Sequence, residues 1–197
     1  EAAKAADVTP AAVYRHFADK ATLVAAVAES GFERLAHAME TAAKAAEERA
    51  PSGDAEHAAL LAMGAAYVRF AGAHPSHFGA MLEGGPGKTK PPRELVGRAT
   101  DRLLAGMPPA EKRTARRAAF AALHGLAMLV AHGTPAEREP AACEAAAREV
   151  LELVLRGARA GSLSQRDAGI GVSAKDRSSA APSGPASTTP RRDIAGS

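Results

Sequence analysis

Residues 7–20, with the sequence DVTPAAVYRHFADK, constrain the fold of this 197-residue chain more than any other segment. Thr9 is a good N-cap, because its hydroxyl can accept a backbone N–H from the next helical turn. Pro10 then takes the first helical position, where its missing N–H is no loss. Val13 and Phe17 are four residues apart and share one inward face. The segment therefore predicts the turn and second helix of a helix-turn-helix, followed by the start of a long helix.

The outward side chains of this short helix are small residues flanked by hydrogen-bonding groups. They are Ala11, Ala12, Tyr14, Arg15 and His16. Such a surface suits insertion into the major groove of DNA. The alternative is a surface helical hairpin that carries a Tyr and a His by chance, and the spacing alone does not decide between the two.

Residues 6–17, followed by Asp19, Lys20 and Leu23, resemble the DNA-binding domain of TetR-type bacterial transcriptional regulators. The family pattern is Ala-Gly-Val-Ser/Thr, a few variable residues, and then Tyr-x-His-Phe-x-x-Lys-x-x-Leu. Asp7 departs from it, because the family usually has Gly there, and a left-handed turn costs Asp about 1 kcal/mol more than Gly.

The resemblance implies a DNA-binding role for eight residues of this segment. It assigns phosphate contacts to four side chains and base contacts to three, with Pro10 at the start of the recognition helix. The phosphate contacts are Thr9, Tyr14, His16 and Lys20, and the residues facing the bases are Ala11, Ala12 and Arg15. Tyr and His offer stiff hydrogen-bond donors, and Lys20 opens a helix whose N-terminus already favours an anion.

The chain begins at Glu1 without an initiating Met, and residues 1–6 have the composition of the middle of a helix. In the family, a preceding helix completes the DNA-binding domain, so we expect an N-terminally truncated sequence that lacks this first helix. The main expectation is a DNA-binding regulator. The alternative is a ligand-binding and dimerisation module that no longer binds DNA because the first helix is absent.

Composition favours an all-α fold. The helix former alanine is abundant, tryptophan is absent, and there are no alternating Val/Ile/Thr runs of the kind that predict strands. The net charge of +3 is modest, and two of these units fall after Gly161, so the charge does not indicate nucleic acid. A single Cys143 excludes an internal disulfide framework and fits a reducing cytoplasm. We expect no membrane span, no secretory signal and no cofactor.

Apolar periodicity and the Pro and Gly breaks predict a series of helices in three parts. The parts are residues 1–48, the helix-turn-helix with its connecting helix; residues 54–160, the ligand-binding and dimerisation core; and residues 161–197, a disordered tail. The expected helices run from Lys20 to about Arg49, from a cap at Asp54 to His74, through Phe78 to Leu82, from Leu95 to Gly106, from Ala110 to about His132, and from Glu139 to about Arg159.

The core also resembles a TetR subgroup that is named for a Trp preceding a His-Gly pair. Here the Trp position holds Phe120, and the pair is His124-Gly125. The resemblance implies a small-molecule pocket and a homodimer formed by the last two helices. The candidate pocket residues are Tyr67, Phe70, His74, Phe78, Met81, Phe120, His124 and Met128. Ordinary core packing is the alternative for each residue taken singly, and the group as a whole favours a pocket.

The sequence predicts no metal site and no catalytic site. His74 and His77 flank Pro75-Ser76, but no Cys or carboxylate at matching spacing completes a ligand set. No nucleophile–base pair stands out, so an enzyme is the least favoured class. The expected partners are double-stranded DNA, a small-molecule effector and a second copy of the chain.

Overall fold

A computed structural model describes residues 16–83 and 100–170 of the chain. All regular secondary structure in these residues is helical, which confirms the predicted all-α class. The helices are α3 (Lys20–Arg49), α4 (Ala55–Ala73), α5 (Pro75–Glu83), α7 (Pro109–His132) and α8 (Pro140–Ile170). Within the described ranges, no helix has the length and apolar character needed to cross a bilayer.

The long helix α3 begins and ends where the sequence predicts. Asp19 caps it, with a carboxylate oxygen accepting the Thr22 backbone N–H at 2.7 Å. Its inward stripe has a helical spacing and consists of Ala28, Gly31, Leu35, Met39 and Ala43. Gly31 does not break the helix. A Cβ at that position would lie 2.7 Å from the Met81 sulfur, so the glycine permits α5 to pack closely on α3.

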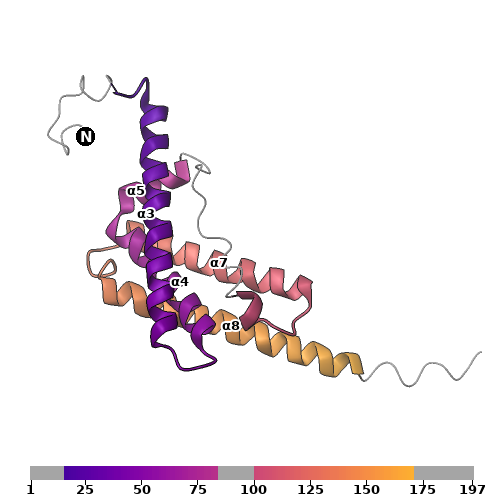
Figure 1. Ribbon diagram of the computed structural model, residues 1–197. Coiled ribbons are helices and arrows are strands. Elements are labelled where there is room, and N and C mark those ends of the chain that lie inside the picture. Colours follow the sequence, from indigo (N-terminus) through magenta and orange to yellow (C-terminus); the bar gives the residue numbers. More distant parts are fainter. Residues whose placement is uncertain (1–15, 84–99, 171–197) are drawn as a thin grey trace, which may run out of the picture. The chain divides into compact units, whose positions relative to one another are not determined.

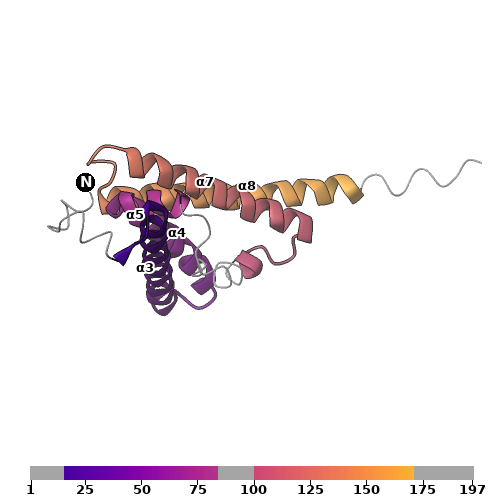
Figure 2. The same cartoon turned by 90° about the horizontal axis from the view of Figure 1, so that it is seen from above.

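Helix α4 is the central helix and is buried on almost every side, as its nearly continuous apolar sequence predicts. Figures 1 and 2 show it between α3 and the pair formed by α7 and α8. Glycines on α4 allow this close packing: a Cβ at Gly64 would lie 2.4 Å from Leu151 of α8, and one at Gly72 would lie 2.9 Å from Val130 of α7.

The start of α4 differs from the prediction in one detail. Asp54 occupies the N-cap position, but its side chain makes no capping hydrogen bond. Its backbone angles, φ −105° and ψ 1°, are not the extended angles of an ordinary N-cap, so the carboxylate is not held over the first N–H groups of the helix.

Helices α7 and α8 lie side by side and run in opposite directions, as both views show (Figures 1 and 2). The break predicted at Thr134-Pro135 is present and is closed by a capping box. The Glu137 carboxylate accepts from the Thr134 backbone N–H at 2.7 Å and from its hydroxyl at 2.9 Å. Arg138 then donates to the Val130 and Ala131 carbonyl oxygens at the end of α7.

Helix α8 continues past Arg159, where the sequence predicted its end, to Ile170. No proline occurs between Pro140 and Pro182, and an isolated Gly161 does not stop a helix, so the sequence contains no strong terminator there. The expectation of a disordered segment from residue 161 is therefore wrong for residues 161–170, and residues 171–197 lie outside the described residues. By internal contacts, the chain divides into one unit ending at Ser162 and another beginning at Leu163.

The predicted helix over residues 95–106 is described only at its end. Residues 100–103 are helical, and the turn that follows contains Gly106 with φ +84°. This left-handed angle favours glycine, and the helix ends at residue 103, three residues before the predicted end at Gly106. The remainder of that helix and the loop before it lie outside the described residues.

Candidate functional site

The DNA-binding candidates lie at the beginning of α3 and before it. Six of them, Thr9, Pro10, Ala11, Ala12, Tyr14 and Arg15, are outside the described residues. His16 and Lys20 are described and both are solvent-exposed. The Asp19 cap between them holds the first turn of α3, and hydrogen bonding to the Thr22 backbone N–H lowers the pKa of its carboxyl group. Both basic side chains are therefore available to a phosphate at this end of the helix.

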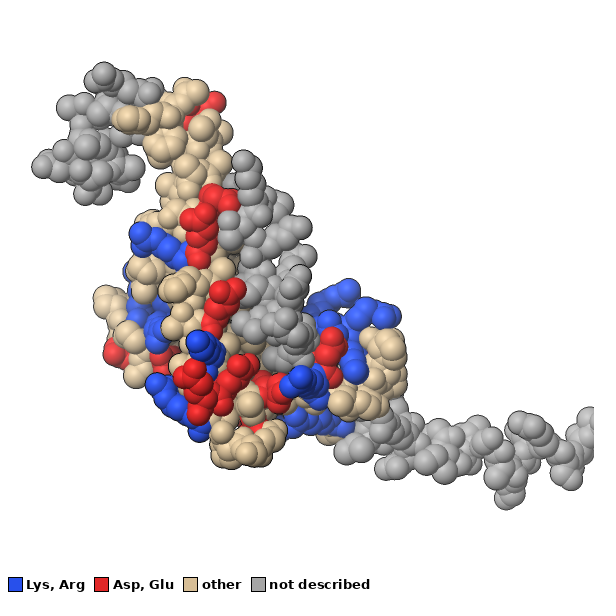
Figure 3. Space-filling view, viewed as in Figure 1, with Lys and Arg blue, Asp and Glu red and all other residues tan. Residues whose placement is uncertain are grey.

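Charges on the core are mixed rather than segregated. On the face shown in Figure 3, acidic and basic side chains of the described residues are interspersed over the helices. A surface of this kind provides no broad positive field for a DNA backbone. The DNA-binding candidates on the segment before α3 and on its first turn therefore gain no support from a positive field on this face.

An aromatic cluster joins α4, α5 and α7. The Tyr67 ring of α4 meets the Phe78 ring of α5 edge-on, with centroids 5.9 Å apart. On α7, His124 lies 6.0 Å from Phe78, and Phe120 stacks on His124 at 5.5 Å with an interplanar angle of 13°. The structure thus brings together four of the eight residues that the sequence grouped as a ligand site.

One hydrogen bond connects the polar atoms of this cluster. The Tyr67 hydroxyl and His124 Nδ1 are 2.8 Å apart. Burial raises the pKa of Tyr67 to about 12, so the phenol stays protonated at neutral pH. When the hydroxyl donates to Nδ1, the other ring nitrogen of His124 carries a hydrogen and can donate in turn. The cluster is therefore a group of packed rings with one hydrogen bond inside it, and its outer ring, Phe120, is 61% exposed.

The other four residues of the predicted group lie in different surroundings. Phe70 is buried and packs on His74, with ring centroids 5.0 Å apart. Met81 packs against Gly31 of α3, and Met128 is a partly buried residue at the edge of the core. These contacts are those of ordinary core packing, which is the alternative given above for each residue taken singly.

The described residues contain no group of three His, Cys, Asp or Glu side chains that could hold a metal ion. His74 and His77 do lie together, with ring centroids 5.9 Å apart. The pKa of His77 is lowered, first by burial and then by the nearby charges of Arg34 and His74. The charged form of His77 is thus disfavoured where α5 meets α3.

Polar contacts between α4 and α8 were not predicted from the sequence. His57 Nε2 lies 2.8 Å from a Glu152 carboxylate oxygen, and Arg69 donates to Glu144 at 2.6 Å. The partners are separated by 95 and 75 residues, so no local motif could have indicated them. Glu144 and Glu152 are eight residues apart, which places both on one side of α8 and is a sequence signal of this face.

Two family models match the chain. Residues 1–27 match the model described as bacterial regulatory proteins of the tetR family, and residues 60–154 match the model described as a tetracyclin repressor-like C-terminal domain. The first match includes the helix-turn-helix candidate and the first turns of α3, and the second includes the aromatic cluster.

No curated protein and no solved structure matches the chain. The two domain matches together cover more than half of the sequence, with the DNA-binding domain before the core domain, as the sequence predicts. The chain accordingly belongs to the TetR family of DNA-binding transcription regulators.

Proposed function

We propose that this regulator is a homodimeric repressor, located in the cytoplasm, that a small molecule releases from a palindromic DNA operator. The observation that carries the proposal is the continuity of α3. This single helix of 30 residues follows the helix-turn-helix segment in the chain and packs along α4 and α5, two of the three helices that contribute the aromatic cluster. A movement of α4 or α5 would therefore act directly on α3, the helix that positions the DNA-binding residues.

The aromatic cluster supports an effector that is mainly apolar and has one hydrogen-bonding group. Tyr67, Phe78, Phe120 and His124 supply aromatic surface, and the Tyr67–His124 pair supplies the polar connection. Sites for small molecules have this character, with an apolar lining and a few placed polar groups. The stacked Phe120 and the following His124-Gly125 pair also favour the Trp-His-Gly subgroup, with Phe in place of Trp.

Exposed apolar side chains on α7 and α8 support a dimer. Leu129 of α7 is 73% exposed, and Leu153 of α8 is 66% exposed. Gly125 and Gly157 have open space where a Cβ would lie, so a second pair of helices could approach closely there. The four-helix interface proposed from the sequence would cover these side chains.

In a dimer, two recognition helices would lie about one DNA turn apart, roughly 34–36 Å, which requires a palindromic operator. Thr9, Tyr14, His16 and Lys20 would then contact phosphates, with Ala11, Ala12 and Arg15 toward the bases. An effector that binds more tightly to a second arrangement of α3 would populate that arrangement and change the distance between the two recognition helices. The dimer would then no longer match the operator and would be released from it.

The test is a fluorescence-anisotropy titration of DNA flanking the gene, with and without candidate effectors. The chain contains two tyrosines, which provide a matched pair. Tyr14→Phe should weaken binding about tenfold by removing one hydrogen bond to a charged phosphate. Tyr67→Phe should leave effector-free binding unchanged. Equal DNA affinity of the Tyr14 variant and the parent would contradict the proposed phosphate contact.

A further inference from the structure

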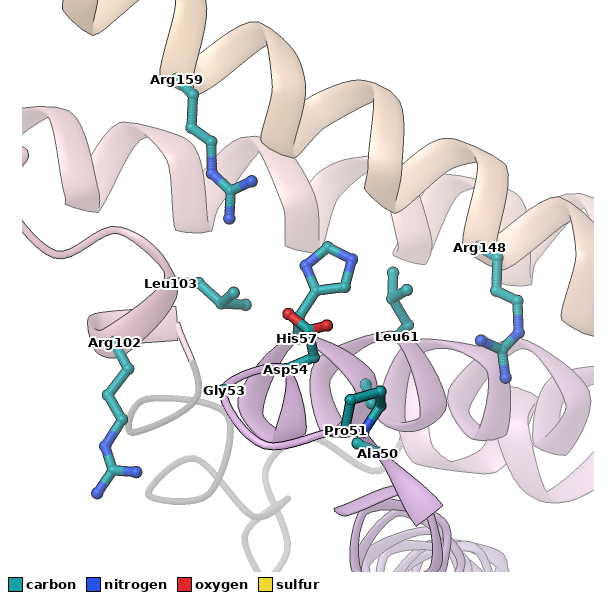
Figure 4. Close-up of a pocket in the computed structure, with 11 residues that line it drawn as sticks. Ala50, Pro51, Gly53, Asp54, His57, Leu61, Arg102, Leu103, Arg148 and Arg159 are labelled. Atoms are coloured by element: carbon teal, nitrogen blue, oxygen red, sulfur yellow. The ribbon is translucent and has the colours of Figure 1, made fainter. Parts of the chain in front are cut away.

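A cleft of about 670 Å³ lies at the end of α3 opposite the DNA-binding segment. Figure 4 shows it between the loop that follows α3, the first turns of α4, the segment around residue 102, and α8. The volume is within the range of small-molecule sites, about 300–1,000 Å³. Its lining shares no residue with the aromatic cluster, so it is a separate candidate site.

Three arginines line this cleft against a single carboxylate. Arg102 is already paired with Glu56, and this hydrogen bond lowers the pKa of the Glu56 carboxyl group. Arg148 and Arg159 of α8 also line the cleft, and among the described residues neither forms an ion pair. The lining carboxylate is Asp54, whose side chain makes no capping bond. The cleft therefore has two guanidinium groups without an anionic partner in the described part of the chain.

The close-up shows where these groups point. In Figure 4, Arg159 extends from α8 toward His57, and Arg148 extends from the same helix toward α4, while the Arg102 guanidinium turns away from both. Arg148 and Arg159 are eleven residues apart, which is about three helical turns, so they share one face of α8. Because Arg159 points toward His57, it is the better placed of the two to meet an anion inside the cleft.

The centre of the cleft is apolar and is held in place by neighbouring contacts. Leu61 and Leu103 line it between the charged groups, and Leu61 is buried. His57 is fixed by its 2.8 Å contact with Glu152, which lies on α8 between the two arginines in sequence. Arg148 and Arg159 are exposed residues at the border of this apolar surface, where a guanidinium can meet the charged oxygens of an anion.

We propose that this cleft binds a small organic anion, a carboxylate or a phosphate ester, with its charged oxygens on Arg159 and its apolar body on Leu61 and Leu103. Arg148 adds a second positive charge along the cleft, and Asp54 weakens the binding by repulsion. This site is additional to the effector site of the aromatic cluster, and its occupation does not require DNA.

Direct calorimetric titration of the full chain tests the proposal with four probes. Hexanoate and hexyl phosphate carry the same apolar body with a carboxylate or a phosphate, and so distinguish the two head groups. 1-Hexanol lacks the charge, and inorganic phosphate lacks the apolar body. At least one of the two hexyl anions should bind, and both 1-hexanol and inorganic phosphate should bind at least about tenfold more weakly.

Variants locate the binding and separate it from the aromatic cluster. Arg159→Gln should raise the dissociation constant of the bound anion about tenfold, and Arg148→Gln should raise it less. Arg156→Gln is the matched control, because Arg156 is an exposed arginine of α8 that does not line the cleft. Asp54→Asn should tighten binding, since it removes the repelling carboxylate without removing a capping bond.

Several results would overturn the proposal. These are the absence of binding by both hexyl anions, equal binding of 1-hexanol, equal binding of inorganic phosphate, or an equal loss in the Arg156 and Arg159 variants. Weaker binding of the anion by Asp54→Asn would contradict the repulsion assigned to Asp54, and with it the placement of the anion in this cleft. Circular dichroism of each variant shows that the helices are retained. None of these readouts involves DNA, so failure here is distinguishable from failure of the proposed repressor function.

Discussion

Helices α4 and α8 are both rich in apolar residues, but the chain covers them very differently. On α4, buried residues occur on almost every side, from Ala59 to Gly72. On α8, the buried positions Cys143, Ala147, Leu151 and Leu155 recur every four residues and form one stripe. Leu153, on another side of α8, is 66% exposed. The core of this chain is thus complete around α4 and remains one-sided at α8.

This difference predicts which substitutions lower the free energy of unfolding and which only weaken contacts with another molecule. Side chains on α4 and on the inner stripe of α8 meet partners inside the same chain, so their removal should affect folding. The outer side chains of α8 meet no comparable packing among the described residues, so their removal should affect only what binds there. Apolar surface left uncovered in this way is typical of a protein interface.

The largest expected effect contrasts two leucines of α8. Leu151 is 1% exposed, and Leu151→Ala should lower the free energy of unfolding by about 2–5 kcal/mol, because it leaves a cavity against α4. Leu153→Ala should change it by less than about 0.5 kcal/mol at concentrations below the dissociation constant of the dimer. Urea denaturation measures both values.

Protein concentration adds the control for this pair. The proposed dimer predicts that Leu153→Ala becomes more costly as the concentration rises, since Leu153 then contacts a second chain. Equal costs for both leucines at every concentration would mean that Leu153 packs within its own chain, and would remove the contrast between the two sides of α8.

The next effect concerns the polar connection between α4 and α7. Tyr67→Phe should lower the free energy of unfolding by about 1–3 kcal/mol, because it leaves His124 Nδ1 without its hydrogen-bond partner. Thermal and urea denaturation at neutral pH measure the loss. A variant as stable as the parent would show that the hydrogen bond is replaced by water and that the cluster is open to solvent.

The same residue gives a pH dependence with a defined sign. The pKa of Tyr67 rises from 10.0 to about 12 on folding, so between these values the folded chain keeps a proton that the unfolded chain releases. The free energy of unfolding should therefore fall as the pH rises from 10 toward 12, by at most about 1.4 kcal/mol per pH unit. The Tyr67→Phe variant should not show this contribution to the fall in the free energy of unfolding.

The sequence predicted the helices well because strong local signals mark their ends. Asp19 begins α3, Pro75 begins α5, and Thr134 with Pro135 separates α7 from α8, and each signal acts within one turn. The prediction of helix ends and caps failed where the local signal is weak or where its effect depends on the backbone angles. Gly161 did not end α8, and Asp54 takes the N-cap position with backbone angles that keep its carboxylate from capping.

The candidate sites were predictable to a smaller extent. The four-residue spacing of Phe120 and His124 places both rings on one face of α7, and the structure shows them stacked. The Tyr67–His124 hydrogen bond joins residues that are 57 positions apart, so it depends on how α4 crosses α7. The cleft was not predicted, because its residues come from three separate stretches of the sequence and only their tertiary arrangement brings them together.

A smaller effect comes from the same substitution at two glycines. Gly64→Ala would place a Cβ 2.4 Å from Leu151, so it should lower the free energy of unfolding by about 1 kcal/mol despite the better helix propensity of alanine. Gly79→Ala on α5 meets open space and should raise it by about 0.5–1 kcal/mol. Opposite signs in thermal denaturation would confirm that α4, unlike α5, has no room for a methyl group. A stabilised Gly64 variant would show that Leu151 moves aside easily.

The smallest expected effect lies at the turn between α7 and α8, where hydrogen bonds rather than buried surface hold the chain. The Glu137 carboxylate accepts from the Thr134 backbone N–H, and this bond lowers the pKa of the Glu137 carboxyl group below its usual 4.5. Because the folded pKa is lowered, the stabilisation is present above pH 4.5 and is lost as the pH falls through the folded value. Glu137→Gln should therefore lower the melting temperature slightly at pH 7, and the difference should shrink below pH 4.5. Glu149→Gln is the control, because Glu149 is an exposed residue of α8 outside this turn. A difference that persists unchanged at low pH would mean that the turn depends on the shape of the side chain and not on its charge.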